Sequence, residues 1–376
     1  MSSSYLLLFG ALQLVSDSAL AIRAGRLLDP ATGTVSQNVV LIMRGDRVAQ
    51  RIENASSWRA PAGINLIDLS AYTVLPGLID THVHLTLGGR PRDNAAATVR
   101  AGFTTVADLG SGNYSAIRLK RLIDADSVIG PRMIAAGSWI GGRGGVCEFG
   151  GATIRGVEEA TVRVMADLNA EAQLIKFCVT NWLPVALQQP DSVELTDAEM
   201  SAIATRASAA NRRTVAHAIG QRGALAAAQH GVPWLAHTPV VDSAAAARLA
   251  SNQVCVSSTL TSLAQGPEGA ALLASFQRLR RAGVRTTTGT DAGVVPHGSN
   301  ANELVTLTEV GMSPLDALRA ATLWAAECVG LGSDYVSLKV GAPADLIAFR
   351  ADPLANIRAL LEPAVVILRG RVILQR

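Results

Sequence analysis

The sequence predicts an α/β protein built as a (β/α)8 barrel (a TIM barrel), with a small β-sandwich domain assembled from both chain ends. Two observations predict the barrel: eight apolar, β-rich runs recur between residues 72 and 332, and Ala-rich helical stretches separate most of them. About 260 residues is also the usual length of this fold. Short strands and turns before and after this region predict the second domain.

The composition supports one large folded core. The 376 residues are 49% hydrophobic and 17% charged, which excludes a disordered chain, a coiled coil and a fibrous protein. The formal net charge is only +3, and no dense Lys/Arg cluster occurs. We therefore expect no nucleic acid and no membrane among the partners. Only Lys120, Lys176 and Lys339 supply lysine among the 33 basic residues, a preference that codon bias explains.

The N-terminal segment, residues 1–18, is apolar and is a possible signal peptide. Residues 5–15 have the length of a signal h-region, and residues 19–21 (ALA) resemble a cleavage site. Against this, no Lys or Arg precedes the run, and cleavage there would fall directly against the first expected strand, residues 22–28. Cytoplasmic and secreted or periplasmic locations both stay open.

Residues 19–71 and 333–376 predict one composite β-sandwich domain. In the first part, NVVLIMRGDRVAQRI contains a Gly45-Asp46 pair that predicts a hairpin. In the second part, residues 344–349 and 363–374 have the same strand character. Both parts can meet if residues 72–332 form a closed barrel that returns to its start.

The barrel region has the alternation that (β/α)8 barrels share with doubly wound sheets. Neither the G-x-G-x-x-G fingerprint nor a P-loop is present, which favours the barrel. The eight expected strands are residues 74–85, 104–109, 132–140, 174–179, 214–217, 234–237, 254–259 and 284–291.

The four cysteines are widely spaced and include no CxxC pair. This pattern indicates neither a disulfide framework nor a thiolate zinc site, so we expect buried free thiols. They are Cys147, Cys178, Cys255 and Cys328.

Four of the six histidines fall at the carboxyl ends of expected barrel strands, where barrel enzymes place their active sites. His82 and His84 are two residues apart, so both side chains point to one face of the first strand. His217 and His237 end the fifth and sixth strands, although each alone could be an ordinary hydrogen-bonded histidine. His230 lies before Gly231 at the end of a helical stretch and is not a candidate.

Asp291 and Lys176 complete the set. Asp291 ends the eighth strand, which neighbours the first in a closed barrel, so it should stand beside His82 and His84; alone, it could be a turn cap. Lys176 lies in LIKFCV, an apolar strand without a free edge, where burial favours the neutral amine. A neutral amine can add carbon dioxide and become a carbamate.

With these residues the chain resembles the amidohydrolase superfamily of metal-dependent hydrolases. The motifs that carry the resemblance are LPGLIDTHVHL (75–85), LIKFCVT (174–180), TVAHAIG (214–220), WLAHTP (234–239), TGTDAG (288–293) and the tail SLKVGAPADLIAFRADPL (337–354). Residues 289–322 and LTDAEMSAIATRA are most similar to the Xaa-Pro dipeptidase (prolidase-like) and imidazolonepropionase-related branch. Two loops depart from that branch, at Asn181 after the fourth strand and at Arg143 after the third.

The resemblance implies two divalent ions, most suitably Zn²⁺. His82, His84 and Asp291 would hold one ion, His217 and His237 the other, and carboxylated Lys176 would bridge them, with carbon dioxide as the source of the carbamate. A hydroxide bridging the metals would attack the amide, and Asp291 would move the proton to the leaving amine. His297, Arg143 and Asn181 are candidate substrate-binding residues.

The expected reaction is therefore cleavage of an amide bond in a dipeptide or an N-acyl amino acid, by a protein that is expected to be a homo-oligomer. A cyclic amidohydrolase that opens a lactam or imide ring is the alternative. A deaminase is disfavoured, because His217 is followed by Ala218, Ile219 and Gly220 rather than by H-x-x-E. A non-catalytic binding barrel is also disfavoured, because all six ligand positions are present.

Overall fold

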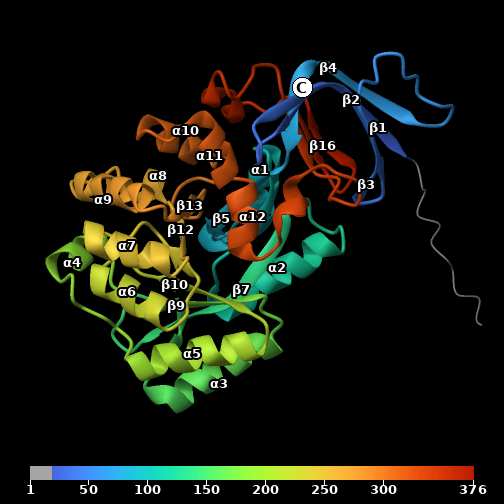
Figure 1. Ribbon diagram of the computed structural model, residues 1–376. Helices are drawn as coiled ribbons and strands as arrows, with labels where there is room; N and C mark the ends of the chain where they lie inside the picture. The colour runs from blue at the N-terminus through green and yellow to red at the C-terminus, as the bar shows by residue number, and fades with distance from the viewer. Residues whose placement is uncertain (1–18) are drawn as a thin grey trace, which may run out of the picture.

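The computed structural model describes residues 19–376, so the possible signal segment, 1–18, lies outside the described residues. Figure 1 shows a barrel surrounded by helices and, beside it, a separate sheet in which the blue N-terminal and red C-terminal strands lie together. The fold class predicted from the sequence is confirmed.

Eight parallel strands form the barrel, and each overlaps an expected run. The first expected run, however, is broken at Gly77, where a Cβ atom would collide with the side chain of Thr104; its first residues belong to the other sheet. In barrel order the strands are β5 (Leu78–Val83), β6 (Phe103–Asp108), β7 (Arg132–Gly142), β9 (Leu174–Cys178), β10 (Arg213–His217), β11 (Trp234–Ala236), β12 (Cys255–Ser257) and β13 (Arg285–Thr287). The short β8 (Ala152–Ile154) pairs with β7.

The barrel closes between β5 and the segment that follows β13. The Thr81 amide donates to the Thr288 carbonyl at 2.8 Å, and the Asp291 amide donates to the His82 carbonyl at 2.8 Å. This closure makes the last strand a neighbour of the first.

Helices cover the outside of the barrel because their Ala-rich faces pack on the strands (Figure 1). α5 begins with a capping box, in which Thr196 and Glu199 satisfy each other's amides. α6 ends before His230, which lies next to Gly231 as expected. The helices are α1 (Pro91–Arg100), α2 (Ser115–Asp124), α3 (Gly156–Asn169), α4 (Leu183–Gln188), α5 (Asp197–Ala209), α6 (Gln221–Gln229), α7 (Ser243–Ser251), α8 (Leu260–Leu263), α9 (Gly269–Arg281), α10 (Asn302–Glu309), α11 (Pro314–Ala320) and α12 (Leu323–Val329).

The second sheet has seven strands in the order β16-β15-β14-β4-β1-β2-β3. Side chains from six of these strands share one apolar core, so the sheet curls around its own interior. The hairpin predicted at Gly45-Asp46 is confirmed, since Arg44 pairs with Arg47 across it. The strands are β1 (Leu20–Asp29), β2 (Thr34–Arg44), β3 (Arg47–Ile52), β4 (Asn65–Pro76), β14 (Leu346–Phe349), β15 (Val365–Leu368) and β16 (Arg371–Gln375).

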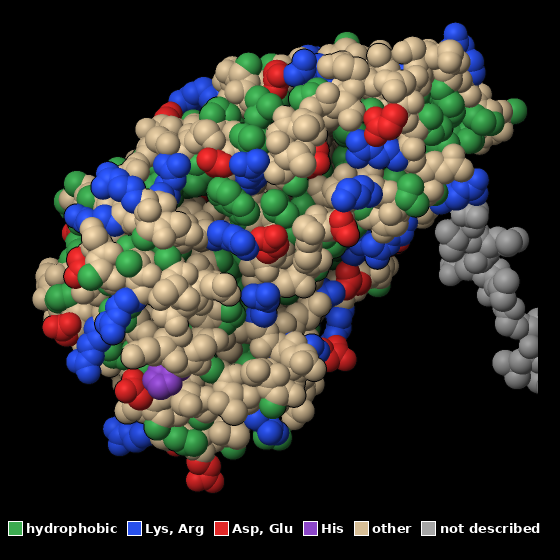
Figure 2. Space-filling view, viewed as in Figure 1, with side chains coloured by type: hydrophobic (Ala, Val, Ile, Leu, Met, Phe, Trp, Pro, Cys, Tyr) green, Lys and Arg blue, Asp and Glu red, His purple; other side chains and the backbone are tan. Residues whose placement is uncertain are grey.

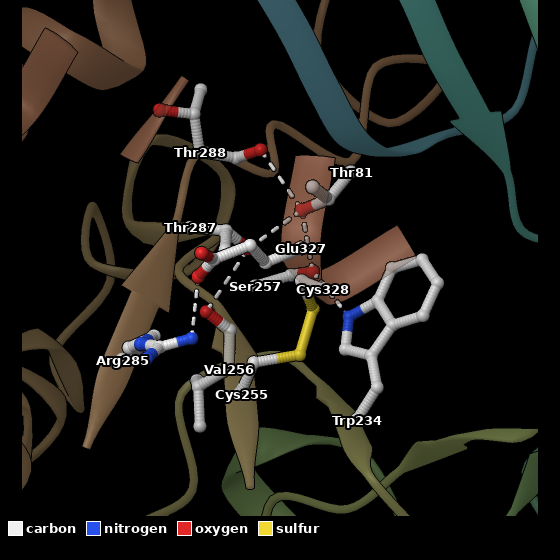
Figure 3. Close-up of a disulfide and its surroundings, with 10 residues drawn as sticks. All are labelled: Thr81, Trp234, Cys255, Val256, Ser257, Arg285, Thr287, Thr288, Glu327 and Cys328. Atoms are coloured by element: carbon white, nitrogen blue, oxygen red, sulfur yellow. Dashed lines mark hydrogen bonds and ion pairs between the residues drawn. A yellow bond between two sulfur atoms is a disulfide. The ribbon is translucent and has the colours of Figure 1, made fainter. Parts of the chain in front are cut away.

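The expectation of free thiols is wrong, because all four cysteines are paired. Cys147 is bonded to Cys178 and Cys255 to Cys328, with Cα–Cα separations of 6.1 and 6.0 Å. The partners are 31 and 73 residues apart in sequence, and the fold brings them together. Figure 3 shows the second bond joining the start of β12 to α12, beside Trp234, whose indole nitrogen donates to the Ser257 hydroxyl at 2.8 Å.

The visible face of the molecule carries basic and acidic side chains interspersed, without a continuous patch of one sign (Figure 2). Within residues 19–376, no helix has both the length and the apolar character needed to cross a membrane.

Candidate metal centre

His82, His84 and Asp291 lie together at the carboxyl end of the barrel. His82 on β5 and His84 just after its end are two residues apart, and their Nε2 atoms lie 3.3 Å from each other. One carboxylate oxygen of Asp291 lies 3.3 Å from Nε2 of His82 and 3.4 Å from Nε2 of His84. The expected adjacency of the first and last strands is therefore confirmed. All three side chains are buried and can offer ligand atoms to one ion.

His217 and His237 lie on the adjoining side of the same site. Their ring centroids are 4.6 Å apart, and the ring of His237 is 4.7 Å from that of His82. The backbone of His237 is left-handed, with φ of 75°, which costs free energy in a non-glycine residue. Its Nδ1 lies 3.0 Å from the Thr259 hydroxyl, a contact that orients the ring.

Lys176 lies among these histidines on β9 and is only 2% exposed. It is paired in register with Trp139 of β7 and Val215 of β10, so it is enclosed by strands on both sides. Among the described residues, Nζ has no hydrogen-bond partner. Burial lowers the pKa of Lys176 to about 7, although Asp291 opposes the shift.

These properties fit the metal site that the sequence implies. A buried ammonium without a partner is costly, whereas a carbamate bound to cations would satisfy the same atom. Nitrogen and carboxylate donors without thiolate suit zinc. The roles of the six residues as ligands stay predictions.

Burial also keeps the histidines neutral, which is the state that binds a metal. Desolvation lowers the pKa of His84 and of His217 to about 3, and it lowers those of His82 and His237 in the same direction. Burial raises the pKa of Asp291 to about 6, with Lys176 acting against it.

Two contacts outside the six residues orient the first histidine pair. Nδ1 of His84 lies 3.1 Å from the Gly110 carbonyl and donates to it, which leaves Nε2 as the ligand atom. The Asp80 carboxylate accepts the His82 amide at 3.0 Å and the Thr290 amide at 3.1 Å. It therefore braces β5 against the segment that carries Asp291.

Sequence reasoning missed Asp80 and Thr259. The signal for Asp80 was a carboxylate inside the apolar run LPGLIDTHVHL, where a charge needs partners. Thr259 gave no comparable signal, because a threonine after a strand is ordinary.

The three candidate substrate-binding residues follow barrel strands and already have protein partners. The Arg143 guanidinium lies 3.1 Å from Glu159 and is half exposed. Nδ1 of His297 lies 3.2 Å from the Thr98 hydroxyl, and its Nε2 lies 3.3 Å from the His84 carbonyl. The side-chain oxygen of Asn181 accepts the amide of Trp182 at 2.8 Å.

A closed barrel with histidines, a buried lysine and an aspartate at its carboxyl end is the arrangement expected of a metal-dependent hydrolase, and comparison with known proteins shows the family. Residues 73–373 match the model of the amidohydrolase family. The chain belongs to the amidohydrolase family.

Similar solved structures place it in the prolidase-like branch, as the sequence predicted. An Xaa-Pro dipeptidase with bound methionine is 26% identical, with a TM-score of 0.85 over 94% of this chain and 99% of the other. A prolidase complexed with N-methylphosphonate-L-proline is 25% identical, with a TM-score of 0.84 over 96% of this chain and 100% of the other.

A curated relative, the ochratoxinase of Aspergillus niger, is 28% identical over 276 residues. That match covers 68% of this chain and 55% of the ochratoxinase, so the chain spans about half the length of this relative.

Proposed function

We propose that this protein is a binuclear metal-dependent amidohydrolase that cleaves the amide bond of a dipeptide or an N-acyl amino acid. One observation carries the proposal: the buried amine of Lys176, which has no hydrogen-bond partner within residues 19–376, lies among four histidines and Asp291. His82, His84 and Asp291 would hold one divalent ion, most suitably zinc, and His217 and His237 the second. Lys176, carboxylated by carbon dioxide, would lie between them.

The metal ions, when bound, supply Lewis acidity that polarises the scissile carbonyl and lowers the pKa of water from about 15.7 towards neutrality. The protein's own residues manage the proton. A carboxylate oxygen of Asp291 accepts the proton of the attacking water and delivers it to the leaving amine nitrogen. The contacts from Gly110 and Thr259 orient the imidazole rings of His84 and His237, which would hold the metal ions.

The comparisons support the dipeptide and acyl-amide assignment at the level of the branch. A dipeptidase and a prolidase are among the similar solved structures, and each aligns over nearly the whole of this chain.

The test combines metal content with product release. The zinc-loaded protein is incubated with dipeptides, N-acyl amino acids, and cyclic imides and lactams, and amine release is followed by mass spectrometry. We expect two zinc ions per chain and release of free amino acids from the linear amides. Turnover of the cyclic compounds alone would indicate ring opening instead, and metal binding without any turnover would leave a binding barrel.

A further inference from the structure

Three large apolar side chains stand exposed on the loops that follow barrel strands at the metal centre. Phe149 follows β7, Trp182 follows β9, and Val294 follows β13. Their exposed fractions are 65%, 43% and 61%. Exposed apolar surface is unfavourable in water. Because these three side chains gather at the end of the barrel that holds the candidate metal centre, we expect a ligand to cover them.

The two aromatic rings reach two different histidines of the site, Trp182 directly and Phe149 through Trp139. The Trp182 ring packs edge-on against the His217 ring, with centroids 5.0 Å apart. The Phe149 ring lies 4.9 Å from that of Trp139, which in turn lies 5.5 Å from the ring of His84. One aromatic surface therefore adjoins each half of the candidate metal pair.

The Phe149 side is rigidly built. Trp139 is buried and packs closely against Gly110. The contact is so close that a Cβ atom on residue 110 would lie 2.8 Å from the indole nitrogen. Cys147, two residues before Phe149, is bonded to Cys178, two residues after Lys176. This bond fixes the loop that carries Phe149 to the strand that carries the lysine, so the surface is preorganised for binding.

The two candidate residues that could bind a substrate carboxylate, Arg143 and His297, already have protein partners. The Arg143 guanidinium is turned to Glu159 on α3, and both ring nitrogens of His297 have protein partners. These two candidate anion-binding groups therefore already have protein partners.

We propose that Phe149, supported by Trp139, and Trp182 select amide substrates that carry a bulky aromatic group next to the scissile bond. The inference rests on the proposed function, since it assigns the substrate class of the same site. Burying an aromatic ring removes about 150–250 Å² from water, enough to raise kcat/KM by about tenfold or more.

The experiment uses four N-acyl amino acids that share one amide chemistry: acetyl-Ala, acetyl-Phe, phenylacetyl-Ala and phenylacetyl-Phe. We expect kcat/KM of the zinc-loaded protein to rise about tenfold or more when an aromatic group is added to acetyl-Ala. Phe149→Ala and Trp182→Ala should each lower kcat/KM for the aromatic compounds by more than for acetyl-Ala, which removes most of one such gain, and Trp182→Phe should restore it. Val340→Ala, which removes an equally exposed apolar side chain from the other domain, is the matched control.

Equal turnover of all four compounds would overturn the aromatic selection and leave the amidohydrolase proposal intact. A second measurement keeps the inference testable if none is cleaved: calorimetric binding of 3-phenylpropionohydroxamate and acetohydroxamate to the zinc-loaded protein. The inference is supported if the wild type binds the phenyl compound more tightly than acetohydroxamate and the double variant Phe149→Ala/Trp182→Ala binds both equally. Equal affinities refute it.

Discussion

One carboxylate oxygen of Asp291 lies 3.3 Å from Nε2 of His82, so the segment that ends the barrel supplies a group to the strand that begins it. The two residues are far apart in sequence, and the backbone bond from the Asp291 amide to the His82 carbonyl fixes their distance. The candidate metal centre therefore exists only when the barrel is closed.

Asp291→Asn tests the proton transfer. The amide keeps the shape of the side chain but cannot accept and release the proton, so we expect kcat to fall by about 10²–10⁴-fold. The thermal unfolding midpoint of the metal-free protein should stay close to that of the wild type. A variant with wild-type turnover on the same substrate would exclude Asp291 as the proton carrier.

Lys176→Met separates metal binding from folding. Methionine fills a similar volume but carries no amine, so it removes a buried polar group that has no hydrogen-bond partner among the described residues. The metal-free variant should therefore unfold at the same or a higher urea concentration than the metal-free wild type. Its zinc content, measured by atomic emission, should drop below two ions per chain, and turnover should be lost.

Lys339→Met, at an exposed lysine, is the control and should retain both metal ions. Carbon-13 NMR with labelled bicarbonate should show a carbamate signal in the wild type that is missing from Lys176→Met. Full zinc content in Lys176→Met would contradict the bridging role.

Asp80→Ala tests the brace behind the histidines. The substitution leaves the buried amides of His82 and Thr290, the Thr290 hydroxyl and the Asn300 side-chain amide without their acceptor. We expect a loss of about 2–4 kcal/mol in the free energy of unfolding, measured with urea.

Zinc affinity should also fall, by about 10–100-fold, because Asp80 orients the segments that carry His82 and Asp291. Asp334→Ala removes an exposed carboxylate and should change neither quantity. Unchanged zinc affinity in Asp80→Ala would show that the brace serves folding alone.

The Cys255–Cys328 bond closes a long loop between β12 and α12 (Figure 3). Because such a bond restricts the unfolded chain, the double variant Cys255→Ala/Cys328→Ala should lose about 2–4 kcal/mol in the free energy of unfolding. Alkylation of the denatured, non-reduced wild type should label no cysteine, whereas four labels would restore the free-thiol expectation.

The sequence by itself determined the barrel, the second sheet built from both chain ends, and the gathering of His82, His84 and Asp291 at one end of the barrel. Each of these depends on local patterns: strand runs followed by helices, a period of two that turns His82 and His84 to one face, and ligand-type residues at strand ends. Strand order then follows from the short, right-handed connections of such barrels, which is why the adjacency of Asp291 and His82 could be predicted.

Only the tertiary structure decided which cysteines pair, which partners occupy Arg143 and His297, and which aromatic rings lie beside the site. Cys147 and Cys178 meet because a loop folds back over a strand end, and loop paths are not encoded in a periodic pattern. Phe149 and Trp182 look like ordinary apolar residues in the sequence. Their exposure follows from long-range packing, which places them on separate loops around one buried lysine.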